Sequence, residues 1–206
     1  MRDQGILVVV SGFSGAGKGT LMRALLKKYH NYALSVSATT RQPREGETDG
    51  KDYFFVSQDK FEQMIEEEQL IEYAQYVNHF YGTPKEYVLR QMAEGKDVIL
   101  EIEIQGALAI KRQFPNALLL FVLPPSAQEL KRRLVGRGTE SLDVIEARLR
   151  RAFDEAEGMD SYDYILVNDD VDACVEGMHE LIKAQHLRVC HNLDFIEQIR
   201  EELKHV

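Results

Sequence analysis

A glycine-rich loop near the N-terminus carries the clearest chemical signal in this sequence. Residues 12–18 fit the spacing G-x-x-x-x-G-K, and the apolar run Ile6–Val10 leads directly into them. Glycines in such a loop allow positive φ and let the backbone approach a ligand closely. Backbone N–H groups and the next helix N-terminus then form an anion site, where Lys18 adds a positive charge. The order of strand, loop and helix predicts a di- or triphosphate site rather than a plain glycine turn.

The residue after the lysine departs from the usual pattern. Most loops of this kind place a Ser or Thr hydroxyl there, in contact with Mg²⁺. This chain has Gly19 instead, and its hydroxyl comes one place later, at Thr20. The Gly-Lys-Gly-Thr variant is similar to the loop of adenylate kinases and some other nucleoside monophosphate kinases. The loop alone therefore predicts a nucleotide without identifying its base.

A second group of reactive side chains lies between residues 39 and 53. Arg41 and Arg44 flank a proline, which limits the freedom of the loop. The planar fork of arginine suits bidentate binding of phosphate. For an arbitrary pair of arginines, a solvated turn is more common than a phosphate site. The choice between the two therefore depends on the rest of the sequence.

The whole 39–53 stretch resembles the monophosphate-binding motif of guanylate kinases, and other segments of that family follow in order. These are Ser35-Val-Ser37, Phe54-Phe-Val-Ser, Glu72, Tyr81-Gly-Thr83, Glu103-Ile-Gln-Gly106, Gly136-Arg-Gly138 and Val167-Asn-Asp-Asp170. The resemblance covers nearly the whole chain, and it is to the guanylate kinases of the bacterial kind. It implies phosphoryl transfer from ATP to GMP, giving ADP and GDP, with Mg²⁺ accompanying ATP and with dGMP as a further acceptor.

The resemblance also implies which residues serve each substrate. The residues expected to bind ATP are Gly12, Phe13, Ser14, Gly15, Ala16, Gly17, Lys18, Gly19, Thr20, Arg133, Arg137 and Asn168. Those expected to bind GMP are Ser37, Arg41, Arg44, Tyr53, Glu72, Tyr81, Gly82, Thr83 and Glu103. Catalysis is expected to depend on Lys18, Arg41, Arg137 and Arg148. No metal ligand is assigned from the chain, and the neighbours Arg150 and Arg151 are expected to be solvated.

The acidic residues of this set suit guanine. Guanine presents adjacent N1–H and N2–H₂ donors that one carboxylate can accept together, whereas adenine presents a bare acceptor at N1. Sites built on such hydrogen bonds discriminate strongly. Glu101 and Glu103 stand where the family usually has Asp, so each carboxylate lies one methylene further from the backbone.

Two of the expected GMP residues also have plain structural explanations. Residues 83–86 read Thr-Pro-Lys-Glu, a good helix start in which Thr83 is the N-cap and the proline takes the first position. Glu72 could be a solvated charge at the end of a helix. Both explanations stay open on the sequence alone.

Composition limits the class of protein. The chain has 206 residues, 44% apolar and 29% charged, which suits one globular α/β domain. Its net charge of −9 argues against general nucleic-acid binding. Two unpaired cysteines, Cys174 and Cys190, predict neither a disulfide framework nor a zinc site and fit a reducing cytoplasm. No apolar run reaches the length of a membrane span, and the first strand begins too early for a signal peptide.

Strands and helices are expected to alternate. Apolar runs predict strands at Ile6–Val10, Val98–Ile102, Ala117–Leu123 and Tyr164–Val167. Helices are expected near Gly17–Tyr29, Gln105–Gln113, Ser126–Gly136, Leu142–Glu157 and Asp172–Leu187. Ser126 and Glu129 have the spacing of a capping box. The alternation predicts an α/β fold, a P-loop NTPase-type parallel sheet with helices on both faces.

Residues 35–95 break this alternation and predict a small mixed α/β insertion with short helices near Asp59–Glu68 and Pro84–Ala93. We expect a single guanylate-kinase-like domain over residues 1–206. Its core would be residues 1–34 and 96–190, with a GMP-binding insertion at 35–95 and a lid at about 137–150. A C-terminal helix at about 192–205 is expected, and this tail suggests a homo-oligomer.

Three other functions compete with this interpretation. An adenylate-kinase-like enzyme is favoured only by the Gly-Lys-Gly-Thr loop and is opposed by Glu72 and Glu103. A P-loop GTPase switch would need an N-K-x-D guanine motif, which the sequence lacks. The non-enzymatic guanylate-kinase-like modules of scaffold proteins lack a working phosphate loop, whereas this chain keeps Lys18 and the loop glycines.

Overall fold

A computed structural model describes residues 4–76, 78–136 and 141–206. Its centre is a five-stranded sheet with the strand order β2-β7-β1-β8-β9, and every pairing in it is parallel. The strands are β1 (Leu7–Gly12), β2 (Tyr32–Leu34), β7 (Asp97–Glu101), β8 (Leu118–Leu123) and β9 (Tyr164–Val167). Four of the five were expected, and β2 is the strand that the sequence did not predict.

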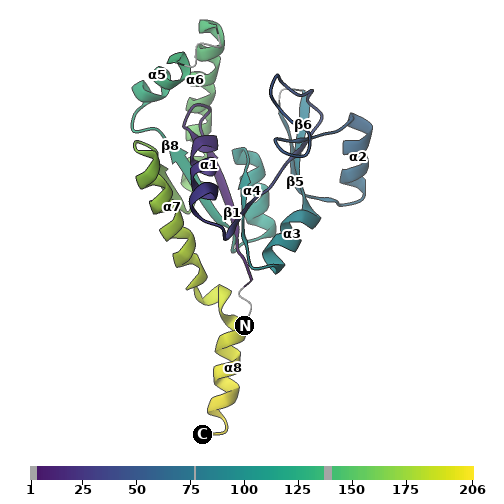
Figure 1. The fold of residues 1–206 in the computed structure, drawn as a ribbon, viewed down its shortest axis with the longest axis vertical. Helices are drawn as coiled ribbons and strands as arrows, with labels where there is room; N and C mark the ends of the chain where they lie inside the picture. The colour runs from purple at the N-terminus through teal and green to yellow at the C-terminus, as the bar shows by residue number, and fades with distance from the viewer. Residues whose placement is uncertain (1–3, 77, 137–140) are drawn as a thin grey trace.

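Helices cover both faces of this sheet (Figure 1). They are α1 (Lys18–Lys28), α3 (Lys85–Ala93), α4 (Ile104–Gln113), α5 (Ala127–Gly136), α6 (Leu142–Ala156) and α7 (Val171–His186). Side chains of β1 alternate between the two layers. Val8 and Val10 pack with α1, α5, α6 and α7, whereas Leu7 and Val9 pack with α3 and α4. The expected P-loop NTPase-type α/β fold is confirmed.

A second, mixed sheet stands beside the core (Figure 1). Its strand order is β4-β3-β6-β5. The elements are β3 (Ala38–Thr39), β4 (Phe54–Phe55), α2 (Gln58–Glu66), β5 (Leu70–Tyr76) and β6 (His79–Pro84). Phe61 of α2 is fully buried and stacks on Phe80 of β6, with ring centroids 5.5 Å apart. This small core fixes the hairpin β5–β6, which carries several of the expected GMP residues.

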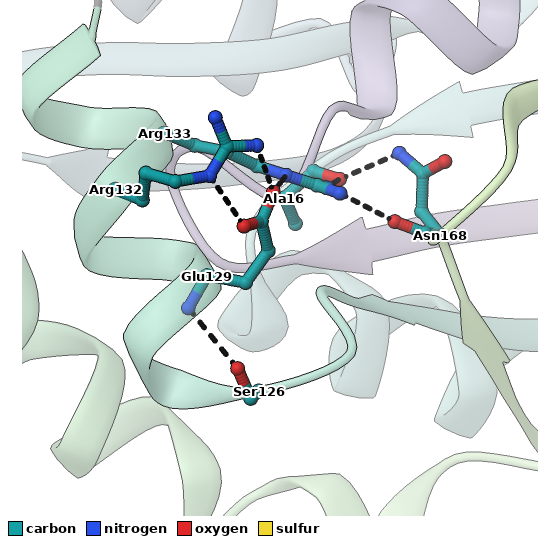
Figure 2. Close-up of polar contacts among 6 residues, drawn as sticks. All are labelled: Ala16, Ser126, Glu129, Arg132, Arg133 and Asn168. Atoms are coloured by element: carbon teal, nitrogen blue, oxygen red, sulfur yellow. Dashed lines mark hydrogen bonds and ion pairs between the residues drawn. The ribbon is translucent and has the colours of Figure 1, made fainter.

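Two helix starts differ from the sequence expectations. Helix α3 begins at Lys85 with Pro84 at the N-cap position, so Thr83 is not a cap but part of β6. At α5, the Glu129 N–H donates to the Ser126 hydroxyl at 3.1 Å, as in a capping box. The Glu129 carboxylate does not complete the box: it accepts hydrogen bonds from two arginines of its own helix (Figure 2).

The chain ends in helix α8 (Leu193–Leu203), which extends beyond the foot of α7 (Figure 1). Four apolar side chains of α8 are exposed, namely Leu193, Phe195, Ile199 and Leu203. Within the described ranges, the structure has no helix that is both long and apolar enough to cross a membrane.

Candidate active site

The phosphate loop is a tight connection between β1 and α1. Gly15 and Gly17 have φ values of 93° and 95°, a region that side chains rarely adopt. A Cβ on Gly17 would also lie only 2.4 Å from Nδ2 of Asn168. The Ala16 N–H donates to the Phe13 carbonyl at 3.0 Å, which closes the turn. The loop therefore needs its glycines both for dihedral angles and for space.

Lys18 folds back over this loop. Its Nζ donates to the carbonyl oxygen of Gly12 at 2.7 Å and to that of Phe13 at 3.3 Å. A cavity of about 250 Å³ opens in front of the ammonium group. It is lined by Ser14, Gly15, Gly17, Lys18, Gly19, Thr20, Arg23 and Glu101. Six of the nine expected ATP residues of the loop thus surround one polar cavity, whereas Gly12, Phe13 and Ala16 are not in its lining.

Arg133 and Asn168 support the loop through its backbone (Figure 2). Asn168 is buried, and its Nδ2 donates to the Ala16 carbonyl at 2.8 Å. Arg133 donates to the same carbonyl at 3.4 Å and to the Asn168 carbonyl at 2.8 Å. Glu129 accepts from Arg133 Nε at 2.7 Å. The structure brings both expected ATP residues to the loop, where their polar atoms stabilise its shape.

Arg23 is a cavity residue that the sequence analysis missed. It lies one helical turn after Gly19, and a Cβ on Gly19 would be 3.7 Å from its Nη1. Its Nη2 donates to the Thr20 hydroxyl at 3.2 Å. Gly19 itself belongs to α1 and is not among the glycines with positive φ. The i,i+4 spacing on α1 was the signal that could have identified Arg23.

The arginine loop of the insertion is held by its own carboxylate. Arg41 forms a bidentate ion pair with Glu47, with both N···O distances 2.8 Å. Glu47 also accepts the Arg44 N–H at 2.7 Å. The Arg41 guanidinium lies 5.2 Å from the centre of the Tyr53 ring, and the Tyr53 and Tyr81 rings are 6.0 Å apart. The structure thus brings Arg41, Tyr53 and Tyr81 together.

The Glu47 carboxylate occupies the fork of Arg41 as a phosphate group would. Hydrogen bonds from Arg41 hold the pKa of Glu47 below its usual value. The same hydrogen bonds raise the pKa of Arg41, which stays charged. Glu47 was not among the residues predicted from the sequence, although a carboxylate six residues from an arginine in a constrained loop was a visible signal.

Glu72 is a buried carboxyl on β5, not a solvated charge at a helix end. Its residue is 6% exposed, and the Thr83 hydroxyl donates to its Oε1 at 2.7 Å. Burial raises the pKa of Glu72 to about 7, although the hydrogen bonds from Thr83 act in the opposite direction. A Cβ on Gly106 would lie 2.7 Å from Oε2 of Glu72, so the glycine lets α4 approach the carboxyl.

Two more carboxylates lie at the carboxyl end of β7, between the loop and the insertion. Burial raises the pKa of Glu101, while the charges of Lys18 and Arg23 lower it. Glu103 is the N-cap residue of α4, and its side chain is 56% exposed. The carboxyl ends of parallel strands are where α/β proteins generally bind ligands.

The remaining expected residues are placed as follows. Arg148 of α6 donates to the Ser14 hydroxyl of the phosphate loop. Ser37 precedes β3, and its carbonyl accepts the Phe54 N–H at 2.9 Å. Gly82 is buried in β6 opposite Tyr73, and the Arg44 residue is exposed. Arg137 lies outside the described residues, as do three others of the expected lid.

The cavity residues fit a magnesium–nucleotide complex. Mg²⁺ typically takes one or two carboxylates together with substrate phosphates and waters. Glu101 and Thr20 supply one carboxylate and one hydroxyl beside Lys18. Across the residues that the structure describes, no group of three or more His, Cys, Asp or Glu side chains could hold a metal ion.

Comparisons with known proteins agree with this geometry. A model of the guanylate kinase family matches residues 4–185. The guanylate kinase of Caldanaerobacter subterraneus subsp. tengcongensis is 50% identical over 202 residues, 98% of each chain. That of Bacillus subtilis is 48% identical over 189 residues, 91% of this chain and 93% of the relative.

A solved structure extends the similarity to three dimensions. The guanylate kinase from Anaplasma phagocytophilum matches with a TM-score of 0.77 and 30% identity, covering 93% of this chain and 91% of that one. The comparisons favour a guanylate kinase over the alternatives that the sequence left open. The chain belongs to the guanylate kinase family of enzymes, which phosphorylate GMP with ATP.

Proposed function

We propose that the phosphate loop binds ATP, that the insertion binds GMP, and that the phosphoryl group passes between them near the end of β7. The observation that carries this proposal is the pairing of a lysine-lined phosphate cavity with a buried carboxyl, Glu72, on a separate sheet. No side-chain nucleophile is needed, because an oxygen of the GMP phosphate attacks the γ-phosphorus of ATP directly.

Guanine recognition would rest on the pair Glu72 and Thr83. The ionised Glu72 carboxylate can accept the N1–H and N2–H₂ donors together, and the Thr83 hydroxyl holds it in place. A buried carboxylate facing the bare N1 of adenine would lose this compensation. Ser37, Gly82 and Glu103 would complete the base site.

The GMP phosphate would bind Arg41, Arg44, Tyr53 and Tyr81. Because Glu47 holds both terminal nitrogens of Arg41, the phosphate must replace Glu47 there or share the guanidinium with it. The fork is already oriented by Glu47 and by the Tyr53 ring, so little rearrangement of Arg41 is required.

On the ATP side, Lys18 would exchange its two loop carbonyls for the outer phosphates. Arg148 and Arg137 would neutralise charge on the transferring phosphoryl group, which is the main source of catalysis in such reactions. Glu101 and Thr20 would hold Mg²⁺ through its waters or directly. The metal would screen the phosphate charge. Arg133 and Asn168 would maintain the loop rather than react.

The proposal includes an organisation of the whole chain. The core would be residues 1–34 and 96–190, with GMP bound by residues 35–95 and a lid at about 137–150. The exposed apolar side chains of α8 support a homo-oligomer. Free Cys174 and Cys190 support a cytoplasmic location, and the net charge of −9 supports an absence of nucleic-acid partners.

A coupled ADP-release assay tests the proposed function. Purified protein with MgATP is offered AMP, GMP, CMP, UMP or dGMP as the acceptor. We expect GMP to be used by a wide margin, with dGMP accepted as well. Turnover of AMP equal to that of GMP would contradict the proposed base site.

A further inference from the structure

Arg151 joins two parts of the proposed active site. Its Nη2 lies 3.1 Å from Oε2 of Glu103, at the start of α4. Its Nε lies 2.5 Å from Oε1 of Glu155, one turn further along α6. Arg151 and Glu155 are an ordinary i,i+4 pair on one helix. The contact with Glu103 is different, because it crosses from α6 to a residue of the proposed guanine site.

The partner of Arg151 is a carboxylate with more freedom than its site requires. Glu103 has one more methylene, and so one more rotatable bond, than an aspartate at the same place. Its side chain is 56% exposed, so packing does little to select a rotamer. If such a long side chain becomes ordered only when the ligand binds, the lost conformational entropy weakens the binding of the ligand.

Electrostatics also favour the Arg151 guanidinium between Glu103 and Glu155. Burial is the main cause that raises the pKa of Glu155, and the nearby charge of Glu103 raises it further. Arg151 acts against both effects. Without the guanidinium, the two carboxylates would repel each other, and the exposed Glu103 would be the one to turn away.

We infer that Arg151 is a positioning residue for guanine recognition, because it holds the Glu103 carboxylate toward the 2-amino group of GMP. The inference rests on the proposed function, since it requires that Glu103 reads the base. As a positioning residue, Arg151 would act on Glu103 and not on the reacting phosphates or ATP. Its loss should therefore change the affinity for guanine and leave the chemical step intact.

The test compares Arg151→Ala with the matched control Arg150→Ala, an exposed arginine next to it on α6. Acceptors are GMP and IMP, which lacks the 2-amino group. For Arg151→Ala we expect KM for GMP to rise about fivefold, with kcat and KM for IMP nearly unchanged. Arg151→Lys should recover part of the loss. Titration calorimetry with GMP, without ATP, should show the same weakening.

A double-mutant cycle separates positioning from general support of α6. In Glu103→Asp the carboxylate is withdrawn from Arg151, so adding Arg151→Ala should cause little further loss of GMP affinity. Full additivity would overturn the inference. So would an equal effect on GMP and IMP, or an Arg150→Ala effect as large as that of Arg151→Ala.

The proposed function itself is judged on a separate measurement. If the unmodified protein prefers GMP over AMP and only the Arg151 results fail, the role of Arg151 is refuted. If the unmodified protein does not prefer GMP, the proposed function is refuted.

Discussion

Because Glu72 is buried, we expect the substitution Glu72→Gln to increase the stability of the protein while it decreases the activity. The pKa of this carboxyl is about 7 in the fold, against an ordinary 4.5. The folded protein therefore binds a proton more tightly than the unfolded chain does. Stability from the protonated carboxyl is fully present below pH 4.5 and is lost as the pH rises through 7. The difference between the two pKa values corresponds to a loss of roughly 3 kcal/mol in the free energy of unfolding at pH 8, relative to a group that stays neutral.

Glu72→Gln has nearly the same shape and stays neutral at every pH. Its amide oxygen can still accept from the Thr83 hydroxyl, which now lies 2.7 Å from Oε1. At pH 8 we expect the variant to unfold at a higher urea concentration than the parent, because its free energy of unfolding is larger by up to about 3 kcal/mol. At pH 4.5 the two free energies of unfolding should be nearly equal. Urea titrations without nucleotide, at several values from pH 4.5 to 8, measure it.

Activity should fall in the same variant. The amide turns a donor toward the donors of guanine, so kcat/KM for GMP should fall. The fall should correspond to a loss of roughly 2–4 kcal/mol of transition-state stabilisation. A stability difference that does not change with pH would refute the buried, titrating carboxyl. A variant that phosphorylates GMP as well as the parent would refute its role in reading the base.

Further predictions concern the same site. GMP needs the ionised Glu72, so kcat/KM for GMP should fall about tenfold per pH unit below 7 in a pH–rate profile; a flat profile would contradict this. Lys18→Ala should nearly abolish turnover while the circular dichroism spectrum is kept, whereas Arg41→Ala should mainly weaken GMP binding measured by calorimetry. If Lys18→Ala instead weakened GMP binding and Arg41→Ala weakened ATP binding, the assignment of the ATP and GMP sites would be wrong. Gly19 has no positive φ, and a Cβ there would make only an ordinary contact, 3.7 Å from Nη1 of Arg23, so Gly19→Ser should fold, remain active and need equal or less Mg²⁺; loss of activity with an intact fold would show that the glycine is required. The expected lid and the GMP-binding insertion should close over the two substrates, so GMP and ATP together should reduce the radius of gyration in small-angle scattering. An unchanged radius would contradict this closure.

The sequence predicted the core because its signals are local. Strands buried on both faces are continuous apolar runs, and the phosphate loop is one short pattern between a strand and a helix. Strand β2 has three residues, Tyr32–Leu34, too few to show a period. Thr83 fitted both a helix cap and a ligand-site residue, and only the three-dimensional position of Pro84 at the N-cap excluded the cap.

Contacts between distant residues could not be predicted in the same way. Arg151 was expected to be solvated, because its partner Glu103 lies 48 residues away and no local pattern links them. The burial of Glu72 depends on Gly106, on a different element. Arg23 and Glu47 were closer to their partners, at spacings of one helical turn and of one short loop. The pairing of opposite charges would have identified Glu47, and the position of Arg23 one helical turn after the phosphate loop would have identified Arg23.

The most direct test of the account is a crystal structure with a bisubstrate analogue in which adenosine and guanosine are joined by a polyphosphate. We predict the guanine edge on the Glu72 carboxylate, the guanosine-side phosphate on Arg41, either in place of Glu47 or sharing the guanidinium with it, and the adenosine-side phosphates on the loop with Lys18. A guanosine bound away from Glu72, or a polyphosphate that leaves the Arg41–Glu47 pair and the Lys18 contacts unchanged, would contradict it.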